Sequence, residues 1–174
     1  PDLDAIVSKA VSNGFLKAST KPTSAEVYLI VVPTPFKGNH EPDISFVEAA
    51  TKGIIPLLKK GDLYIIESTS PIGTTDKMQK LIFASRPELQ GAIHIAYCPE
   101  RVLPGNIMHE LVHNDRVIGG VNEASTEKAI IFYLKPEKRR GGRGEQLFLE
   151  VVKEAKRRKV KRMDWQVLDW NEPA

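Results

Sequence analysis

The stretch LYIIESTSPIGTT, residues 63–75, decides the fold class. It opens with a continuous run of β-branched and aromatic residues, which is typical of a strand buried in a parallel sheet. Pro71 and Gly73 then mark a turn, and Thr74 is placed to open a helix. We therefore predict a strand at 63–68, followed by a turn and by a helix that continues to about residue 85.

The same alternation of strand and helix extends in both directions along the chain. Further strands are predicted at 26–32, 93–97 and 116–121, and further helices at 2–12 and 43–58. Pro56 lies inside the last of these helices and should bend or shorten it. Strands that alternate with helices in this way predict an α/β fold, a three-layer Rossmann-like and mostly parallel sheet with helices on both faces.

Composition excludes several classes of protein. No apolar run in the 174 residues is long enough to cross a bilayer, and Pro1 to Asp4 does not resemble the start of a signal peptide, so we expect no membrane partner. Cys98 is the single cysteine, which rules out an intrachain disulfide and leads us to expect a reducing, cytoplasmic setting.

The charge is distributed unevenly. Residues 135–162 contain twelve Lys or Arg against four acids, a formal charge of +8, while the whole chain carries +3. This break suggests a change of module near residue 130. A solvated basic helix face and an anion-binding or nucleic-acid-binding surface are both open explanations.

Residues 109–113 read HELVH, the H-E-x-x-H pattern in which two histidines on one helix face bind zinc beside a glutamate base. A zinc hydrolase of this kind needs a third ligand from a later helix. Glu123, Glu127 or Glu137 could be proposed, but none lies in a recognisable motif. We therefore expect no metal at His109 and His113.

Three longer segments carry more information: VVPTPFKGNHEPD at 31–43, LKKGDLYIIESTSPIGTT at 58–75, and AYCPERVLPGNIMHELVHNDRVIGG at 96–120. In their order and spacing they resemble the UDP-glucose/GDP-mannose dehydrogenase family, in particular its UDP-N-acetylmannosamine dehydrogenase branch, over about residues 1–133. The resemblance implies part of a Rossmann domain that binds NAD. It also implies a four-electron oxidation of a sugar primary alcohol to a carboxylate, through a thioester on a cysteine.

The resemblance assigns roles to residues at three strand ends. It implies that NAD is bound by Pro33, Thr34, Pro35, Glu67, Ser68 and Thr69, and that the catalytic residues are Thr69, which helps to hold a water, and Glu100. It implies a loop that closes on the UDP-sugar, made of Arg101, Val102, Leu103, Pro104 and Gly105. Turn formation is the alternative role for Pro33, Pro35 and Pro104.

Parts of the family pattern are missing from the sequence. The G-x-G-x-x-G turn that holds the NAD pyrophosphate in such domains does not occur before residue 26. The segment that supplies the nucleophilic cysteine is not found either, and Cys98 is not that cysteine because it directly precedes Pro99-Glu100. We therefore do not expect the complete reaction from this sequence alone.

After residue 133 a second resemblance begins. The segment YLKPEKRRGGRGEQLFLEVVKEAKRRKVKRMDWQVLDWNEPA, at 133–174, resembles the C-terminal part of the GNAT N-acetyltransferases. It implies acetyl-CoA bound at a glycine-rich turn and helix N-terminus by Arg139, Gly142, Arg143 and Gly144, with Asn171 near the thiol end. The acceptor-binding front half of that family is missing, so we do not expect acetyl transfer.

The two resemblances together suggest a recombined or engineered chimera, joined between Ala124 and Leu134, that forms one compact domain from segments 1–133 and 134–174. We predict that a strand at 130–135 lies beside strand 26–32 and completes the sheet, with a right-handed crossover. Residues 130–134 could equally be helix, as the first family implies, or strand, as the second implies.

Three functions remain open at this stage. The first is an inactive chimera with at most weak affinity for the phosphate groups of a nucleotide-sugar, NAD or CoA. The second is an NAD-dependent enzyme completed by partner chains. The third is a basic nucleic-acid-binding module, which we do not favour because the basic run lacks a pattern of interleaved aromatic residues and contains only Phe148. Exposed sheet edges predict self-association into a homo-oligomer.

Overall fold

The computed structural model describes residues 2–102, 110 and 115–133. Strands β1 (Val27–Ile30), β2 (Leu63–Ile66) and β3 (His94–Tyr97) are parallel, and the short β4 (Gly119–Gly120) runs antiparallel to β3. They form one sheet in the order β1-β2-β3-β4. The helices are α1 (Asp2–Ser12), α2 (Ser45–Ile54), α3 (Thr74–Ser85) and α5 (Glu123–Tyr133), with short 3-10 turns at Gly38–His40, Ile55–Leu57 and Pro87–Leu89. The predicted α/β class and mostly parallel sheet are confirmed.

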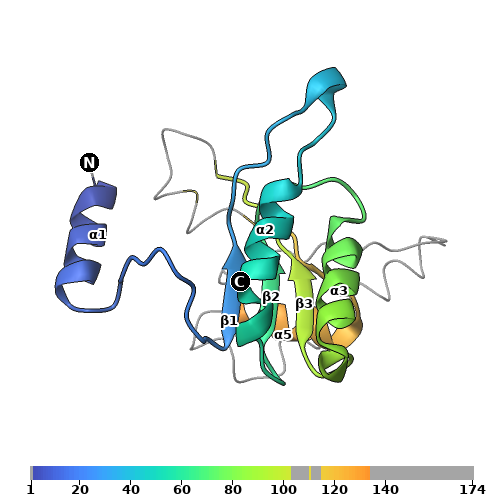
Figure 1. Cartoon of the computed structure of the whole chain (residues 1–174). Helices are drawn as coiled ribbons and strands as arrows, with labels where there is room; N and C mark the ends of the chain where they lie inside the picture. Colours follow the sequence, from blue (N-terminus) through green and yellow to red (C-terminus); the bar gives the residue numbers. More distant parts are fainter. Residues whose placement is uncertain (1, 103–109, 111–114, 134–174) are drawn as a thin grey trace, which may run out of the picture.

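The sheet carries helices on both faces (Figure 1). On one face, Tyr64, Ile66 and Ile95 pack against α2 and α3, and these residues are fully buried. On the other face, Leu63 and Ile65 pack under α5. Successive residues of β2 therefore pack into the apolar cores on opposite sides of the sheet, because successive side chains of a strand point to opposite faces. All four β2 residues are buried, as expected from the continuous apolar run that predicted it.

A buried polar contact joins α2, β2 and α3. The Thr51 hydroxyl donates to the carbonyl oxygen of Val47 at 2.6 Å, and the Tyr64 hydroxyl lies 2.7 Å from the same Thr51 oxygen. Met78 of α3 brings its sulfur within 3.3 Å of it. Each hydroxyl thus has a partner, as a buried polar group requires. Burial also raises the pKa of Tyr64.

Local sequence signals mark several helix ends. The Asp43 carboxylate accepts a hydrogen bond from the backbone N–H of Ser45 at the start of α2. That helix ends at Ile54, and Pro56 lies in the 3-10 turn that follows, so the predicted shortening is confirmed. Gly14 ends α1 with a φ of 74°, a conformation that glycine adopts without strain.

Residues 123–133 correct one prediction. They form the continuous helix α5, which lies on the sheet face over β2, β3 and β4. The predicted strand at 130–135 beside strand 26–32 is therefore wrong for the described residues, and the helix expected from the dehydrogenase resemblance is confirmed up to Tyr133. β-branched residues at 130 and 131 suggested a strand, but packing of Ala129 and Ile130 onto the sheet decides the conformation.

No described helix has the length and apolar character needed to cross a membrane.

Candidate functional site

The segments that follow β1, β2 and β3 lie together at one edge of the sheet. Parallel strands place their carboxyl ends side by side, and ligands of open α/β sheets bind at this edge. Residues 31–35, 67–70 and 98–102, the three segments to which the sequence assigned roles, therefore converge here (Figure 1). The predicted clustering is a consequence of strand direction.

Ser68 connects the first two of these segments. Its hydroxyl oxygen accepts the backbone N–H of Val32 at 2.7 Å and lies 2.8 Å from the Val32 carbonyl oxygen, to which it can donate. The backbone N–H of Ser68 also donates to Ile30 at 3.2 Å. With 7% of its surface exposed, Ser68 is engaged by the loop backbone. It thus holds the β1 and β2 loops in register.

The residues that face outward at this edge are small. Thr69, Pro33 and Pro35 are exposed, and Thr34 is partly buried. Segments 31–35 and 68–70 contain no acidic side chain, which favours an anionic ligand. The Tyr97 hydroxyl supports the second segment by accepting the backbone N–H of Ser70 at 3.2 Å.

Glu67 belongs to a cluster on the α5 side of the sheet. Its carboxylate accepts a hydrogen bond from the Tyr133 hydroxyl and lies 3.7 Å from the Arg116 guanidinium. That guanidinium also lies over the Tyr133 ring, 4.6 Å from its centre, as in a cation–π contact. Burial raises the pKa of Tyr133, and the hydrogen bond to Glu67 raises it further. The Glu67 side chain is thus committed to α5, although the sequence assigned it to NAD.

Cys98 lies beneath this cluster. It is fully buried, and its sulfur is 4.0 Å from an Arg116 nitrogen. Burial raises the pKa of the Cys98 thiol, although the Tyr133 and Arg116 contacts act in the opposite direction. A buried thiol with a raised pKa is a poor nucleophile. The prediction that Cys98 is not the thioester cysteine agrees with this environment.

Glu100 follows β3 and shapes its own loop. One oxygen of its carboxylate accepts the backbone N–H groups of Arg101 at 2.6 Å and Val102 at 2.8 Å. The Glu100 backbone N–H donates to the Glu67 carbonyl oxygen at 3.1 Å, which ties the loop to β2.

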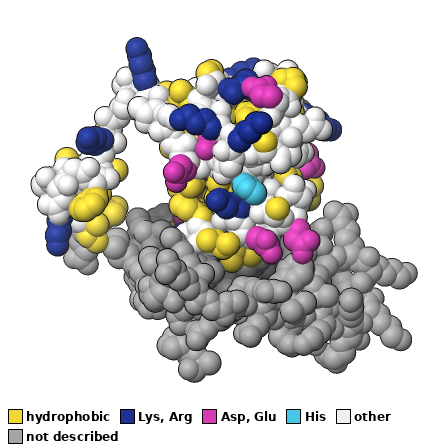
Figure 2. Space-filling view, turned by 90° about the horizontal axis from the view of Figure 1, so that it is seen from below, with side chains coloured by type: hydrophobic (Ala, Val, Ile, Leu, Met, Phe, Trp, Pro, Cys, Tyr) yellow, Lys and Arg dark blue, Asp and Glu magenta, His cyan; other side chains and the backbone are white. Residues whose placement is uncertain are grey.

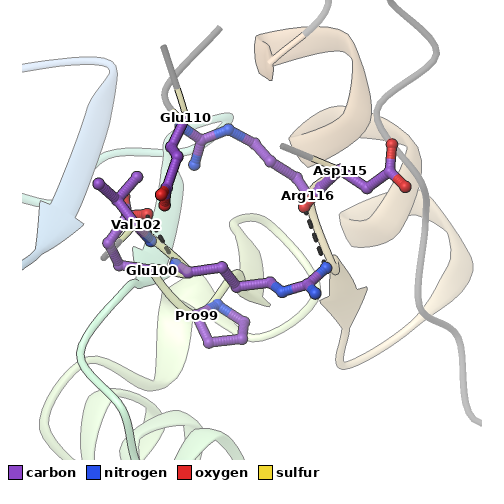
Figure 3. Close-up of a pocket in the computed structure, with 7 residues that line it drawn as sticks. Pro99, Glu100, Val102, Glu110, Asp115 and Arg116 are labelled. Carbon is purple, nitrogen blue, oxygen red and sulfur yellow. Dashed lines mark hydrogen bonds between the residues drawn. The ribbon is translucent and has the colours of Figure 1, made fainter. Parts of the chain in front are cut away.

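A pocket opens beside Glu100 (Figure 3). It is small and partly open to solvent, and it is lined by Pro99, Glu100, Arg101, Val102, Glu110, Asp115 and Arg116. Arg101 donates to the Asp115 carbonyl oxygen at 3.2 Å across its rim. Two arginines and three acidic residues line it, so the pocket offers both hydrogen-bond donors and acceptors to a polar part of a ligand.

Several predicted site residues lie outside the described residues. They are Leu103, Pro104 and Gly105 of the substrate loop, His109 and His113 of the H-E-x-x-H pattern, and Arg139, Gly142, Arg143, Gly144 and Asn171 of the CoA site. Within residues 2–102, 110 and 115–133, no three His, Cys, Asp or Glu side chains are grouped so as to hold a metal ion.

Sequence reasoning missed two residues of this region. Arg116 was part of a quoted motif and Tyr133 lay at a predicted junction, but neither was assigned to the site. Arg116 is the first residue of the strand predicted at 116–121, which was the available signal. Nothing local marked Tyr133, because its contact with Glu67 spans 66 positions of the chain.

Comparison with known proteins agrees with this geometry. The family model for the "UDP-glucose/GDP-mannose dehydrogenase family, NAD binding domain" matches residues 1–135 and extends past the predicted junction at 124–134. UDP-N-acetyl-D-mannosamine dehydrogenases of Yersinia pestis and Escherichia coli K12 are 54% and 52% identical over 141 residues, which cover 76% of this chain and 34% of each relative.

Solved structures show the same likeness. The UDP-N-acetyl-mannosamine dehydrogenase Cap5O from Staphylococcus aureus superposes with a TM-score of 0.71 at 41% identity, over 76% of this chain and 32% of that one. The enzyme from Pyrococcus horikoshii gives 0.68 at 38% identity, over 74% and 32%. The chain spans about a third of the length of these relatives. Over residues 1–135, the chain belongs to the UDP-glucose/GDP-mannose dehydrogenase family and matches its NAD binding domain.

Proposed function

We propose that residues 31–35 and 67–70 form part of an NAD site, and that residues 99–102 form part of a nucleotide-sugar site, of a UDP-N-acetylmannosamine dehydrogenase. The observation that carries the proposal is the convergence of these segments at the carboxyl edge of a sheet that matches an NAD binding domain. A relative named for this substrate is 54% identical over 141 residues, which supports the choice of sugar.

The outward residues of the first two segments fit a dinucleotide. Pro33, Thr34 and Thr69 would contact NAD, while Ser68 holds their loops together from below. Segments 31–35 and 68–70 have no acidic side chain, which suits the pyrophosphate. When bound, NAD supplies the hydride acceptor for oxidation of an alcohol. Glu67 contributes through its backbone, since Tyr133 and Arg116 engage its carboxylate.

Residues around Glu100 would receive the sugar nucleotide. Arg101 and Arg116 line the pocket and can pair with an anionic group of the ligand. Glu100 is held at the pocket by the amides of the two following residues, which orients its carboxylate. Its role as catalytic carboxylate, and that of Thr69 as holder of a water, remain part of this proposal.

We also propose that the 174 residues alone bind NAD but do not oxidise the sugar. Cys98 is the single cysteine of the sequence, and its burial and raised pKa exclude it as an accessible nucleophile. An enzyme completed by partner chains that supply the nucleophile is the alternative. A cytoplasmic setting remains a prediction from cysteine content.

Resemblance of residues 134–174 to a GNAT acetyltransferase also remains a prediction. These residues lie outside the described ones, and the family model ends at 135. A binding measurement is therefore needed to test the predicted acetyl-CoA site, which consists of Arg139, Gly142, Arg143 and Gly144.

Calorimetry on the purified chain with NAD, CoA and UDP tests these proposals. We expect heat of binding with NAD, and its loss in the variant Thr69→Trp, in which a large ring occupies the exposed loop. Thr23→Trp, on the exposed segment before β1, is the matched control and should bind as the original chain does. A folded chain that binds no NAD, or a Thr69→Trp variant that binds it unchanged, would contradict the proposed site.

Two further measurements distinguish the alternatives. Absorbance of NADH should not rise when the chain is mixed with NAD and UDP-N-acetylmannosamine. Turnover by the chain alone would contradict the assignment of Cys98 as non-nucleophilic. Binding of CoA with an affinity that falls after Arg143→Ala would support the acetyltransferase resemblance, and absence of CoA binding would count against it.

A further inference from the structure

Arg116 lies between the segments that follow β2 and β3. Its guanidinium is 3.7 Å from the carboxylate of Glu67, directly after β2, and it lines the pocket beside Glu100, which follows β3 (Figure 3). The Arg116 side chain is 20% exposed, whereas Arg101, the other arginine of the pocket, is exposed at the rim. Of the two cations, Arg116 is therefore the one that the protein encloses.

Three contacts hold the Arg116 guanidinium in place. The Glu67 carboxylate supplies the opposite charge, the Tyr133 ring centre lies 4.6 Å away, and the Cys98 sulfur is 4.0 Å from one guanidinium nitrogen. Glu67 is itself held by the hydrogen bond from Tyr133. These contacts act through charge, a ring face and a weak sulfur acceptor. They orient the guanidinium without using up its five N–H donors.

Arg116 and Glu100 offer opposite hydrogen-bonding capacity to one small pocket. A guanidinium donates hydrogen bonds, and a carboxylate accepts them. Among the described residues, the ion-pair partner of Arg116 is Glu67 rather than Glu100, so a ligand group can lie between the guanidinium and the Glu100 carboxylate. A hydroxyl both donates and accepts, and it is small. An alcohol is therefore the group that best complements this pair.

We propose that Arg116 is a catalytic residue that binds the reacting alcohol of the nucleotide-sugar. The inference rests on the proposed function, in which Glu100 is the catalytic carboxylate. The alcohol proton passes to a carboxylate oxygen of Glu100, and Arg116 donates hydrogen bonds to the alcohol oxygen, on which negative charge develops. The electron pair of the broken O–H bond becomes the second bond of the carbonyl as the carbon gives up its hydride to the proposed acceptor.

The position of Arg116 suits this role physically. A donor that is already oriented before the reaction costs no reorganisation when charge develops on the oxygen. Partial burial strengthens the interaction, because the local dielectric constant is lower than that of water. The pairing with an anionic group that was proposed for Arg116 is thereby narrowed to the reacting oxygen.

Calorimetry of the full chain with two ligands tests the assignment as recognition of the hydroxyl. The ligands are UDP-N-acetylmannosamine and its analogue in which hydrogen replaces the primary hydroxyl. The analogue lacks a hydrogen bond to a charged group, so the original chain should bind it at least about tenfold more weakly. In Arg116→Met this preference should fall to about threefold or less. Arg116→Lys keeps a cationic donor and should retain part of the preference.

Two variants of Tyr133 test how Arg116 is positioned. Tyr133 acts on the ligand through Arg116 and is a positioning residue. Tyr133→Phe keeps a ring beside the guanidinium, and Tyr133→Leu removes it, while both remove the hydroxyl that binds Glu67. The preference for the sugar hydroxyl should therefore be larger in Tyr133→Phe than in Tyr133→Leu. A role of Tyr133 in stability alone would leave the preference the same in both variants.

Arg86→Met is the matched control. Arg86 is also partly buried, and it donates to the carbonyl oxygens of Ile55 and Leu58. It follows the end of α3, at the edge of the sheet opposite the pocket (Figure 1). Figure 2 views the molecule from this opposite side, where charged side chains of both signs are interspersed on the surface. Arg86→Met should keep the full preference for the hydroxyl, whatever its effect on stability.

NMR of the isotope-labelled chain observes the guanidinium directly. The Nε–H signal of Arg116 is assigned by its absence in Arg116→Lys. It should shift when UDP-N-acetylmannosamine is added and shift much less with the analogue. Equal shifts with the two ligands would contradict a hydrogen bond from Arg116 to the hydroxyl.

The outcomes distinguish this inference from the proposed function. Equal affinity of the original chain for the two ligands, or a preference that a folded Arg116→Met variant keeps in full, would overturn the role of Arg116 and leave the sugar site in place. Binding of neither ligand would contradict the sugar site, and this inference with it. If Arg116→Met does not fold, the two Tyr133 variants and the NMR signal still decide the question.

Discussion

The Tyr133 hydroxyl donates a hydrogen bond to the Glu67 carboxylate, and thereby joins the last residue of α5 to the first residue after β2. Arg116 completes the arrangement by lying over the Tyr133 ring and 3.7 Å from the Glu67 carboxylate. The partly buried Glu67 carboxylate thus has two partners, one on α5 and one on the segment before β4. This contact fixes the start of the segment that carries Ser68 and Thr69.

Tyr133→Phe should destabilise the chain without moving α5. Loss of a hydrogen bond to a charged group costs about 1.5–3 kcal/mol, so the urea midpoint should fall. In a double-mutant cycle with Glu67→Gln, the combined loss should be smaller than the sum of the two single losses, because both changes remove the same contact. Additive losses would show that the two side chains do not interact in solution.

Ser68→Ala should loosen the β1 and β2 loops together. It removes the acceptor for the Val32 N–H, and leaving such a group without a partner costs about 1–3 kcal/mol. NAD affinity should fall with it, since the two loops proposed to contact NAD are no longer held in register. Ser85→Ala, on the exposed end of α3, is the control and should change stability by less than about 0.5 kcal/mol.

Cys98 should resist thiol reagents in the folded chain. It is fully buried, and burial raises the pKa of its thiol, so little thiolate is present or accessible at neutral pH. Labelling by an aromatic disulfide reagent should be slow in buffer and fast in urea, where the chain is unfolded. Rapid stoichiometric labelling of the folded chain would contradict both the burial and the assignment of this thiol as non-catalytic.

The ion pair between Glu48 and Lys77 should account for part of the loss of folding stability in acid. Lys77 of α3 donates to its carboxylate at 2.5 Å and lowers the pKa of Glu48 below the usual 4.5. Because the folded pKa is the lower one, the pair contributes stability above pH about 4.5, and this is lost as the pH falls through the folded pKa. Glu48→Gln should therefore cost about 0.2–1 kcal/mol at neutral pH and less in acid.

Urea denaturation at pH values from 7 down to the lowest pH at which the chain folds measures this difference in the free energy of unfolding. Glu127→Gln, at an exposed position of α5, is the matched control and should show no such pH-dependent loss. An equal loss in Glu48→Gln at neutral and acid pH would assign the effect to packing rather than to the charge.

Local sequence patterns were sufficient to predict the buried strand β2 and the ends of two helices. The apolar run at 63–66 predicted a buried strand, and all four residues are buried. Pro56 predicted the early end of α2, and the helix predicted at 2–12 matches α1, because helix-ending preferences act locally. Convergence of the segments after β1, β2 and β3 was also predictable, since parallel strands end at the same edge.

Only the tertiary structure decided the conformation of 130–133 and the partners of Glu67. The β-branched residues there favour a strand by propensity, but burial of Ala129 against the sheet holds them in a helix. Tyr133 and Arg116 meet Glu67 through folding of distant segments, which no local pattern encodes. The sequence by itself determined which segments become strands and where they end, and long-range packing determined which side chains at those ends are engaged.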